Sequence, residues 1–185
     1  MIGYRHTDVR FPFLWEDARQ PPARWHGPGE GPVHTFADTP DGAWAELLRH
    51  EEITEPRDVL GIRRALWAVD LGEPDLARPR LPRRTLTGGP ETYEACRREA
   101  RRLRDRGAQG LVAPSAALRE GGAHGWRVDG GLRPGPPRDG RTIVLFGGRP
   151  DLVGWAAAAE GRPDPALLER VRPLGQGDRP TAPTP

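Results

Sequence analysis

Two kinds of side chain that act together on anionic ligands stand close to each other in the segment 21–50. Arg24 and Trp25 are neighbours in a stretch rich in proline and glycine, and Glu46 follows on the next predicted helix. An arginine guanidinium donates two parallel hydrogen bonds to an anionic group, and a carboxylate stabilises positive charge or accepts a proton. This combination indicates an anion-binding site with an acid beside it.

The same residues also have a purely structural interpretation, which the local pattern alone favours. Glu46 precedes Arg49 by three residues and His50 by four, and this spacing allows ion pairs along a helix surface. Charged side chains at helix edges are commonly solvated. No second histidine stands at ligand spacing from His50, so no metal site is predicted there.

The helix that carries Glu46 has a clear start in the sequence. The run Thr39-Pro40-Asp41 supplies an N-cap hydroxyl, a proline for the first helical position and an acid for the first turn. The spacing predicts a helix over 40–50 with the apolar stripe Ala43, Trp44, Leu47 and Leu48. Glu46 lies off this stripe. The apolar run 33–37 predicts a strand immediately before the helix.

The remaining elements are predicted from hydrophobic periodicity and from proline and glycine breaks. Strands are expected at 2–9, 63–71, 110–113, 142–146 and within 126–132, and helices at 91–106 and 165–171. The run 152–159 fits a strand or a helix, and 10–32, 72–90 and 133–141 read as loops. Strands and helices mix without regular alternation, which is typical of the α+β class.

Length and composition indicate one domain over 1–174 and a disordered tail over 175–185. The chain has 185 residues with 24 glycines and 22 prolines, so many loops are expected. Cys96 is the single cysteine, which argues against a disulfide framework or a cysteine-based metal site. No apolar run reaches membrane-spanning length and no signal peptide opens the chain, so a cytoplasmic location is expected.

All 28 basic residues are arginine, yet the formal net charge is only +2. This balance does not by itself imply a nucleic-acid partner. Six arginines stand on the predicted helix 91–106, at positions 97, 98, 101, 102, 104 and 106. Glu94, Glu99 and Asp105 interrupt them, which favours a solvated face over a nucleic-acid-binding face.

Ser115 follows the apolar run 111–113 and so stands at the end of a predicted strand, where functional residues often lie. A second interpretation is that its hydroxyl only caps the turn after Pro114. The sequence has no Gly-x-Ser-x-Gly elbow around Ser115, so a hydrolase triad is not supported.

Taken in chain order, several short motifs resemble the RES domain family, named for its arginine, glutamate and serine. The motifs are Tyr4-Arg5, Ala23-Arg24-Trp25, Ala37-Asp38-Thr39-Pro40, Glu46 and Ala113-Pro114-Ser115-Ala116. The match spans roughly residues 3 to 172. The resemblance implies an ADP-ribosyltransferase-like α+β fold with a central, largely antiparallel split sheet and an NAD cleft.

The resemblance also implies a function. RES proteins are toxins that consume NAD by hydrolysis or phosphorolysis of the nicotinamide–ribose bond, and some ADP-ribosylate a protein. The implied partners are NAD as substrate, inorganic phosphate and an antitoxin of the Xre type, with no tightly bound cofactor.

The resemblance assigns roles to individual residues of this chain. Glu46 would stabilise the positive charge left on the ribose, and Arg5 and Arg24 would hold the pyrophosphate. Ser115 would bind a ribose hydroxyl or hold the glutamate, and Trp25 would stack on a base.

The chain departs from the family pattern at two places. Pro22-Ala23 replaces a frequent Gly-Gly pair, and Thr35 stands where the family often has a site tyrosine, so that His34 or Tyr4 would have to substitute for it. Two rival functions therefore stay open. One is a catalytically inactive RES fold that binds a nucleotide or a protein, and the other is an arginine-rich nucleic-acid-binding protein.

Overall fold

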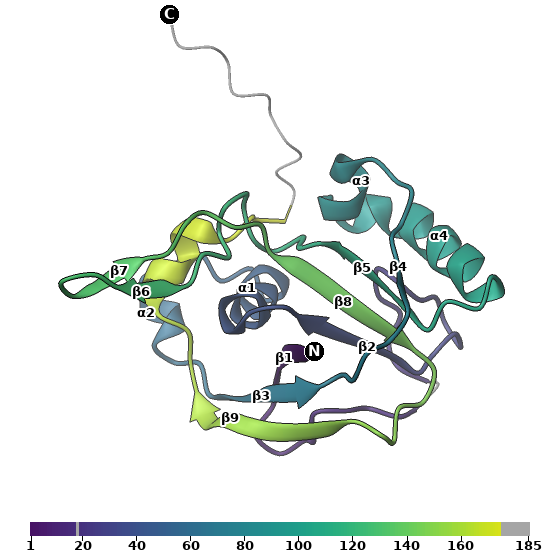
Figure 1. Cartoon of the computed structure of the whole chain (residues 1–185), viewed down its shortest axis with the longest axis horizontal. Helices are drawn as coiled ribbons and strands as arrows, with labels where there is room; N and C mark the ends of the chain where they lie inside the picture. The colour runs from purple at the N-terminus through teal and green to yellow at the C-terminus, as the bar shows by residue number, and fades with distance from the viewer. Residues whose placement is uncertain (18, 175–185) are drawn as a thin grey trace, which may run out of the picture.

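The computed structural model describes residues 1–17 and 19–174. It is built around a seven-stranded sheet with the order β4-β5-β8-β2-β1-β3-β9 (Figure 1). The strands are β1 (Ile2–Thr7), β2 (Val33–Ala37), β3 (Arg64–Asp70), β4 (Leu76–Ala77), β5 (Gly110–Pro114), β8 (Arg141–Phe146) and β9 (Val153–Gly161). Neighbouring strands are antiparallel except for the parallel pair β4–β5. A separate hairpin joins β6 (Trp126–Val128) to β7 (Leu132–Pro134).

Helices flank this sheet. They are α1 (Pro40–His50), α2 (Pro56–Val59), α3 (Arg83–Thr87) and α4 (Tyr93–Asp105), with the 3-10 helices η1 (Pro90–Thr92) and η2 (Pro165–Arg170). The predicted α+β class with a largely antiparallel sheet is confirmed.

Helix α1 begins where the sequence predicts. The Thr39 hydroxyl accepts a hydrogen bond from the Gly42 backbone N–H at 3.0 Å, and Pro40 occupies the first turn. The helix packs against β1 and β2, and its buried residues extend well beyond the predicted apolar stripe. Glu46 is one of the few residues of α1 that keeps partial exposure.

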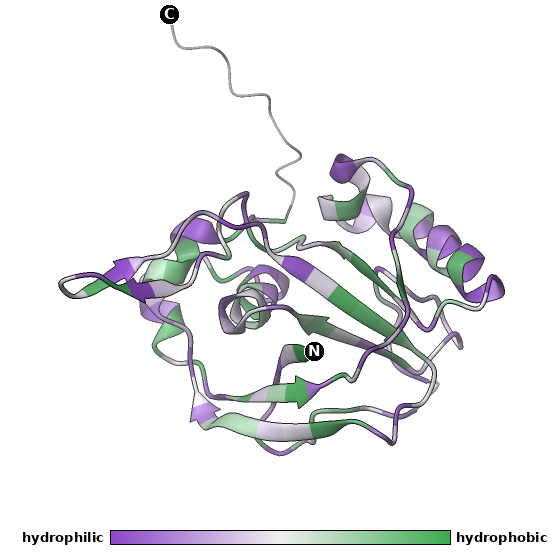
Figure 2. Ribbon diagram, viewed as in Figure 1, coloured by the Kyte–Doolittle hydropathy of each residue, from purple (hydrophilic) through white to green (hydrophobic). Residues whose placement is uncertain are grey.

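Core side chains alternate between the two faces of the sheet, as strand geometry requires. In β8, Val144 packs in one cluster with α4, whereas Ile143 and Leu145 pack in another cluster on the opposite face. In β2, Val33 and Ala37 share the face that α1 and α4 cover, and Phe36 points to the other. Figure 2 shows the central strands largely hydrophobic, while α4 mixes hydrophobic and hydrophilic residues.

The sheet is weakly joined at its centre. Strands β1 and β2 share one register pair, Tyr4 with Ala37, whereas β1 and β3 share six. The sheet therefore opens between β1 and β2, beside the helix that carries Glu46.

Three sequence predictions need correction. Residues 72–90 are not all loop, because they contain β4 and α3, which are too short to show periodicity and are held by packing on β5 and α4. The segment 126–132 does not form one strand, since a turn with positive φ at Gly130 and Gly131 divides it into the β6–β7 hairpin. That hairpin extends into the predicted loop 133–141.

The ambiguous run 152–159 is a strand, β9, which lies at the edge of the sheet beside β3 (Figure 1). The predicted tail, 175–185, lies outside the described residues. Within the described part of the chain, no helix has the length and apolarity needed to cross a membrane.

Candidate functional site

A cavity of about 280 Å³ lies where the sheet opens. Its walls come from α1 on one side and from α3 and the start of α4 on the other, and β1 and β2 contribute the residues between them. Five of the six residues predicted for the site line it, namely Arg5, Arg24, Trp25, Thr35 and Glu46. The structure thus brings together residues from the first strand, the Arg24 loop, the second strand and the first helix.

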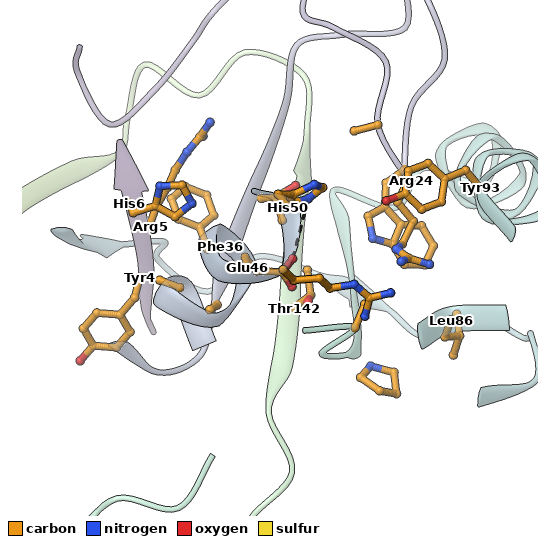
Figure 3. A pocket seen from close by; sticks show the side chains of 18 residues that line it. Tyr4, Arg5, His6, Arg24, Phe36, Glu46, His50, Leu86, Tyr93 and Thr142 are labelled. Atoms are coloured by element: carbon orange, nitrogen blue, oxygen red, sulfur yellow. Dashed lines mark ion pairs between the residues drawn. The ribbon is translucent and has the colours of Figure 1, made fainter. Parts of the chain in front are cut away.

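Glu46 and His50 lie on the α1 wall of the cavity (Figure 3). The Glu46 side chain is 23% exposed, and its carboxylate lies 4.0 Å from His50 Nε2. A partly buried carboxylate in a cavity is available to a ligand, since no arginine neutralises it at ion-pair distance among the described residues. The predicted i to i+4 contact with His50 is present, but both residues also line the cavity.

Arg24 and Tyr93 face α1 from the opposite wall (Figure 3). The Arg24 guanidinium lies 4.7 Å from the centre of the Tyr93 ring. Its Nη2 donates to the Gly88 carbonyl at 2.7 Å, and its Nη1 donates to Thr92 Oγ1 at 3.2 Å. Arg24 therefore holds the rim segment (residues 85–92), which the sequence pattern did not indicate.

The loop that carries Arg24 is fixed by arginines of α4. Glu30 accepts hydrogen bonds from Arg101 at 2.8 Å and from Arg104 at 3.0 Å, and Arg97 donates to the Ala23 carbonyl at 2.8 Å. These arginines of α4 are engaged in the protein rather than in a purely solvated face. The arrangement gives no support to a nucleic-acid-binding face on this side of α4.

Arg49 is a cavity residue that the sequence analysis treated only as a solvated partner of Glu46. It is 4% exposed, and its Nη2 donates to the carbonyl oxygens of Thr87 at 3.2 Å and Gly88 at 2.8 Å. Its buried Nη1 has no hydrogen-bond acceptor among the described residues. Burial lowers the pKa of this guanidinium. Its position between Leu48 and His50 gave no clear signal of this role.

Arg5 lines the cavity from β1. Its Nη1 is also buried without an acceptor in the described structure, and burial lowers its pKa. An unpaired buried guanidinium N–H is costly and favours an anionic ligand.

His6, also on β1, is a second lining residue that the sequence analysis did not single out. Its ring stacks on Trp44 with 6.4 Å between centroids. Burial lowers its pKa to about 3, with further contributions from the charges of Arg64, Arg5 and His50. His6 is therefore neutral near pH 7 and adds no positive charge to the cavity.

Trp25 and Thr35 line the cavity in different ways. Trp25 is only 4% exposed and packs in the core with Val33, Leu86 and Cys96, so most of its surface serves the fold. Thr35 is exposed and also lines the cavity.

The two residues considered as substitutes for the family tyrosine differ in position. His34 is fully buried on the opposite sheet face, with its Nε2 3.1 Å from a Glu16 carboxylate oxygen. It is not among the residues that line the cavity. Tyr4 does line it, although its ring points away from Glu46 (Figure 3).

Ser115 is the predicted site residue that does not line the cavity, although Pro114 and Ala116 do. It is 5% exposed, and its Oγ accepts hydrogen bonds from the backbone N–H groups of Ala117 at 3.2 Å and Leu118 at 3.1 Å. These contacts match the interpretation in which the Ser115 hydroxyl only caps the turn after Pro114. Its role toward a ribose stays a prediction.

Asp38 explains part of the Ala-Asp-Thr-Pro motif. Its carboxylate accepts from the Arg141 backbone N–H at 2.9 Å and from Arg138 Nη2 at 2.7 Å. The motif thereby ties the start of α1 to the start of β8. Among the described residues, no group of three or more His, Cys, Asp or Glu side chains is placed to hold a metal ion.

Comparison with solved structures shows a similar fold in the crystal structure of the M. tuberculosis MbcT-MbcA toxin-antitoxin complex. The TM-score is 0.55 at 16% sequence identity, with 91% of this chain and 86% of that chain covered. No curated protein matches the chain. The family model of the RES domain matches residues 3–163. This chain therefore belongs to the RES domain family.

Proposed function

We propose that this protein cleaves NAD at the nicotinamide–ribose bond. The observation that carries the proposal is the partly exposed Glu46 carboxylate in a cavity that Arg5 also lines. NAD offers matching features, because its pyrophosphate is anionic and its nicotinamide ribose becomes positively charged as the base departs.

The chemistry requires stabilisation of an oxocarbenium-like transition state. The bond between the ribose C1′ and the nicotinamide nitrogen breaks, and its electron pair leaves with the neutral nicotinamide. An oxygen of water or of inorganic phosphate then forms the new bond to C1′. With water as nucleophile, the released proton passes to the Glu46 carboxylate and from there to solvent.

Each cavity residue contributes a separate function in this proposal. Glu46 provides the negative charge facing C1′, and Arg5 provides hydrogen bonds to the pyrophosphate. Arg24 supports the site by holding the rim segment, so that its effect on the substrate is at least partly indirect. Trp25 presents only the edge of a buried ring, which leaves Tyr93 as the more accessible aromatic wall.

We further propose that the protein is the toxin of a toxin–antitoxin pair. Membership of the RES family and the fold shared with a toxin–antitoxin complex support this role. Its partner would be an antitoxin of the Xre type that covers the cavity and keeps NAD out.

The direct test is the release of nicotinamide from NAD by the purified protein, measured with and without inorganic phosphate. The matched control is Glu46→Gln, which keeps size and helix propensity but removes the charge. We expect wild-type turnover and a loss of about a hundredfold in the variant, the scale typical of one electrostatic stabiliser. Expression of the wild type should lower cellular NAD and slow growth, whereas the Gln variant should be tolerated.

An inactive, nucleotide-binding RES fold is the second candidate, and Thr35 at the position of the family tyrosine favours it. It predicts that wild-type protein binds NAD but releases no nicotinamide under either phosphate condition. Full turnover in Glu46→Gln would instead show that another residue supplies the catalytic carboxylate.

A further inference from the structure

We propose that Arg49 binds the phosphate attached to the ribose that loses its base, so that one turn of α1 carries both the acid and an anion-binding residue. This inference rests on the proposed function and gives a substrate-binding role to a residue that the motifs left without one. Arg49 and Glu46 are three residues apart on the same helix, and both line the cavity.

The Arg49 guanidinium is buried and only partly hydrogen-bonded within the described structure. The residue is 4% exposed, and its buried Nη1 has no acceptor among the described residues. The charge of Glu46 is the largest influence that favours the protonated form of Arg49, but the two do not form an ion pair within the described set. A buried cationic N–H group without a partner is strongly unfavourable and is satisfied well by an anionic oxygen.

The Arg49 guanidinium is also held in a fixed orientation. Its Nη2 is held by the carbonyl oxygens of Thr87 at 3.2 Å and Gly88 at 2.8 Å, which fixes the plane in which Nη1 lies. A group that is held in place before binding loses less conformational entropy when the ligand arrives. By contrast, both Nη atoms of Arg24 already donate to the rim segment.

The opposite charges of Glu46 and Arg49 are closely spaced along α1. Residues three apart on a helix have Cβ atoms about 5–6 Å from each other. In a nucleotide, the carbon that loses the base and the 5′ phosphorus are separated by the furanose ring, one methylene and one ester oxygen. A substrate can therefore place its developing positive charge at Glu46 and its phosphate at Arg49 at the same time.

The rival interpretation is that Arg49 only supports the rim segment. The two interpretations differ in which substrates suffer when Arg49 is replaced. A phosphate-binding role affects NAD and nicotinamide mononucleotide, which carry a phosphate on that ribose, and spares nicotinamide riboside, which has none. A supporting role affects all three substrates alike.

The experiment measures kcat/KM for nicotinamide release from these three substrates with the wild type and with Arg49→Met and Arg49→Lys. The control is Arg98→Met, which changes an exposed arginine of α4. We expect Arg49→Met to lower kcat/KM for NAD and the mononucleotide about 10- to 100-fold, the range of a hydrogen bond to a charged group. The value for the riboside should change little, and Arg49→Lys should fall between the wild type and Arg49→Met. Since substrates are compared within one variant, a reduced folded fraction cancels.

An equal loss with all three substrates would overturn the proposal while leaving NAD cleavage intact. If the wild type cleaves none of them, the affinity for ADP-ribose, measured by calorimetry, tests the phosphate contact of Arg49 separately from the proposed function. Binding that weakens at least tenfold in Arg49→Met and is unchanged in Arg98→Met supports the phosphate contact. Equal affinity in the wild type and Arg49→Met, or absence of binding, overturns it.

Discussion

Arg24 and Arg49 donate to the same carbonyl oxygen, that of Gly88, at 2.7 Å and 2.8 Å. One arginine comes from the loop before β2 and the other from α1, so this oxygen connects two walls of the cavity. The rim segment to which it belongs is thus fixed from both sides by charged donors, whose hydrogen bonds are stronger than those of neutral groups.

Replacing Arg24 by Lys should therefore destabilise the protein as well as alter its site. A lysine ammonium cannot reach Gly88, Thr92 and the Tyr93 ring in the same geometry. We expect a loss of about 1–3 kcal/mol in the free energy of unfolding, measured by urea denaturation. Arg98→Lys is the control and should show no loss. An unchanged unfolding midpoint in Arg24→Lys would contradict this anchoring role.

The pKa of His6 predicts loss of stability in acid. The unfolded chain takes up a proton on this histidine near pH 6.5, whereas in the folded state burial holds its pKa at about 3. The unfolded state therefore binds more protons below pH 6.5, and stability falls as the pH falls. We expect a contribution of about 2 kcal/mol between pH 8 and pH 5.

The measurement for His6 compares the pH dependence of the unfolding free energy in the wild type and in His6→Gln. The slope between pH 6.5 and pH 5 should become shallower in the variant. The control is His124→Gln, which changes a histidine whose contact with the Gly125 carbonyl is solvent-exposed. Parallel slopes in the wild type and His6→Gln would show that His6 is protonated in the folded state.

Ser115→Ala should lower stability more than it lowers activity per folded molecule. The change leaves the N–H groups of Ala117 and Leu118 without their side-chain acceptor, at a cost of about 1–3 kcal/mol. Thermal unfolding measures this cost, with Thr35→Ala as the control for an exposed hydroxyl. A large loss of nicotinamide release at unchanged stability would instead favour the ribose-binding role.

Thr35→Tyr should be tolerated and should raise nicotinamide release. The position is exposed and borders the cavity, so a larger side chain does not enter the core, and surface changes of this kind usually alter stability within about 0.5 kcal/mol. A phenol hydroxyl at this position restores the group that the family often places there. We expect about a tenfold increase, a modest effect for one added hydrogen-bonding group. Thr35→Phe has the ring without the hydroxyl and should give no increase.

The part of the site that could be predicted from sequence is the part with local signals. Helix α1 follows from the Thr39 cap and the proline beside it, and Glu46 stands in the second turn of that helix. The role of Arg24 could not be read in this way, because its acceptor Gly88 is 64 residues away. The same holds for Arg49, whose contacts to the rim segment are 38 and 39 residues distant. Helix α3, with five residues, was too short for a periodic pattern.

The local sequence around Ser115 is clear, but it does not decide between two roles for this residue. A serine after a buried strand fits a binding role and a turn cap equally, and the choice depends on the direction of its side chain. In the structure its Oγ accepts hydrogen bonds from the backbone N–H groups of Ala117 and Leu118 in the turn. The resemblance to a family motif could place Ser115 near the cavity but could not give this direction.

The sheet order has a consequence for how the protein is made. Strand β2, which lines the cavity, pairs with β8, and Asp38 is bound by the backbone of Arg141, which is 103 residues later in the chain. Contacts of such long range slow folding, because a long loop must close before they form. The cavity therefore cannot be assembled on the ribosome until β8 has emerged, when most of the domain has been synthesised. If the protein cleaves NAD as proposed, this activity is absent throughout most of its own translation.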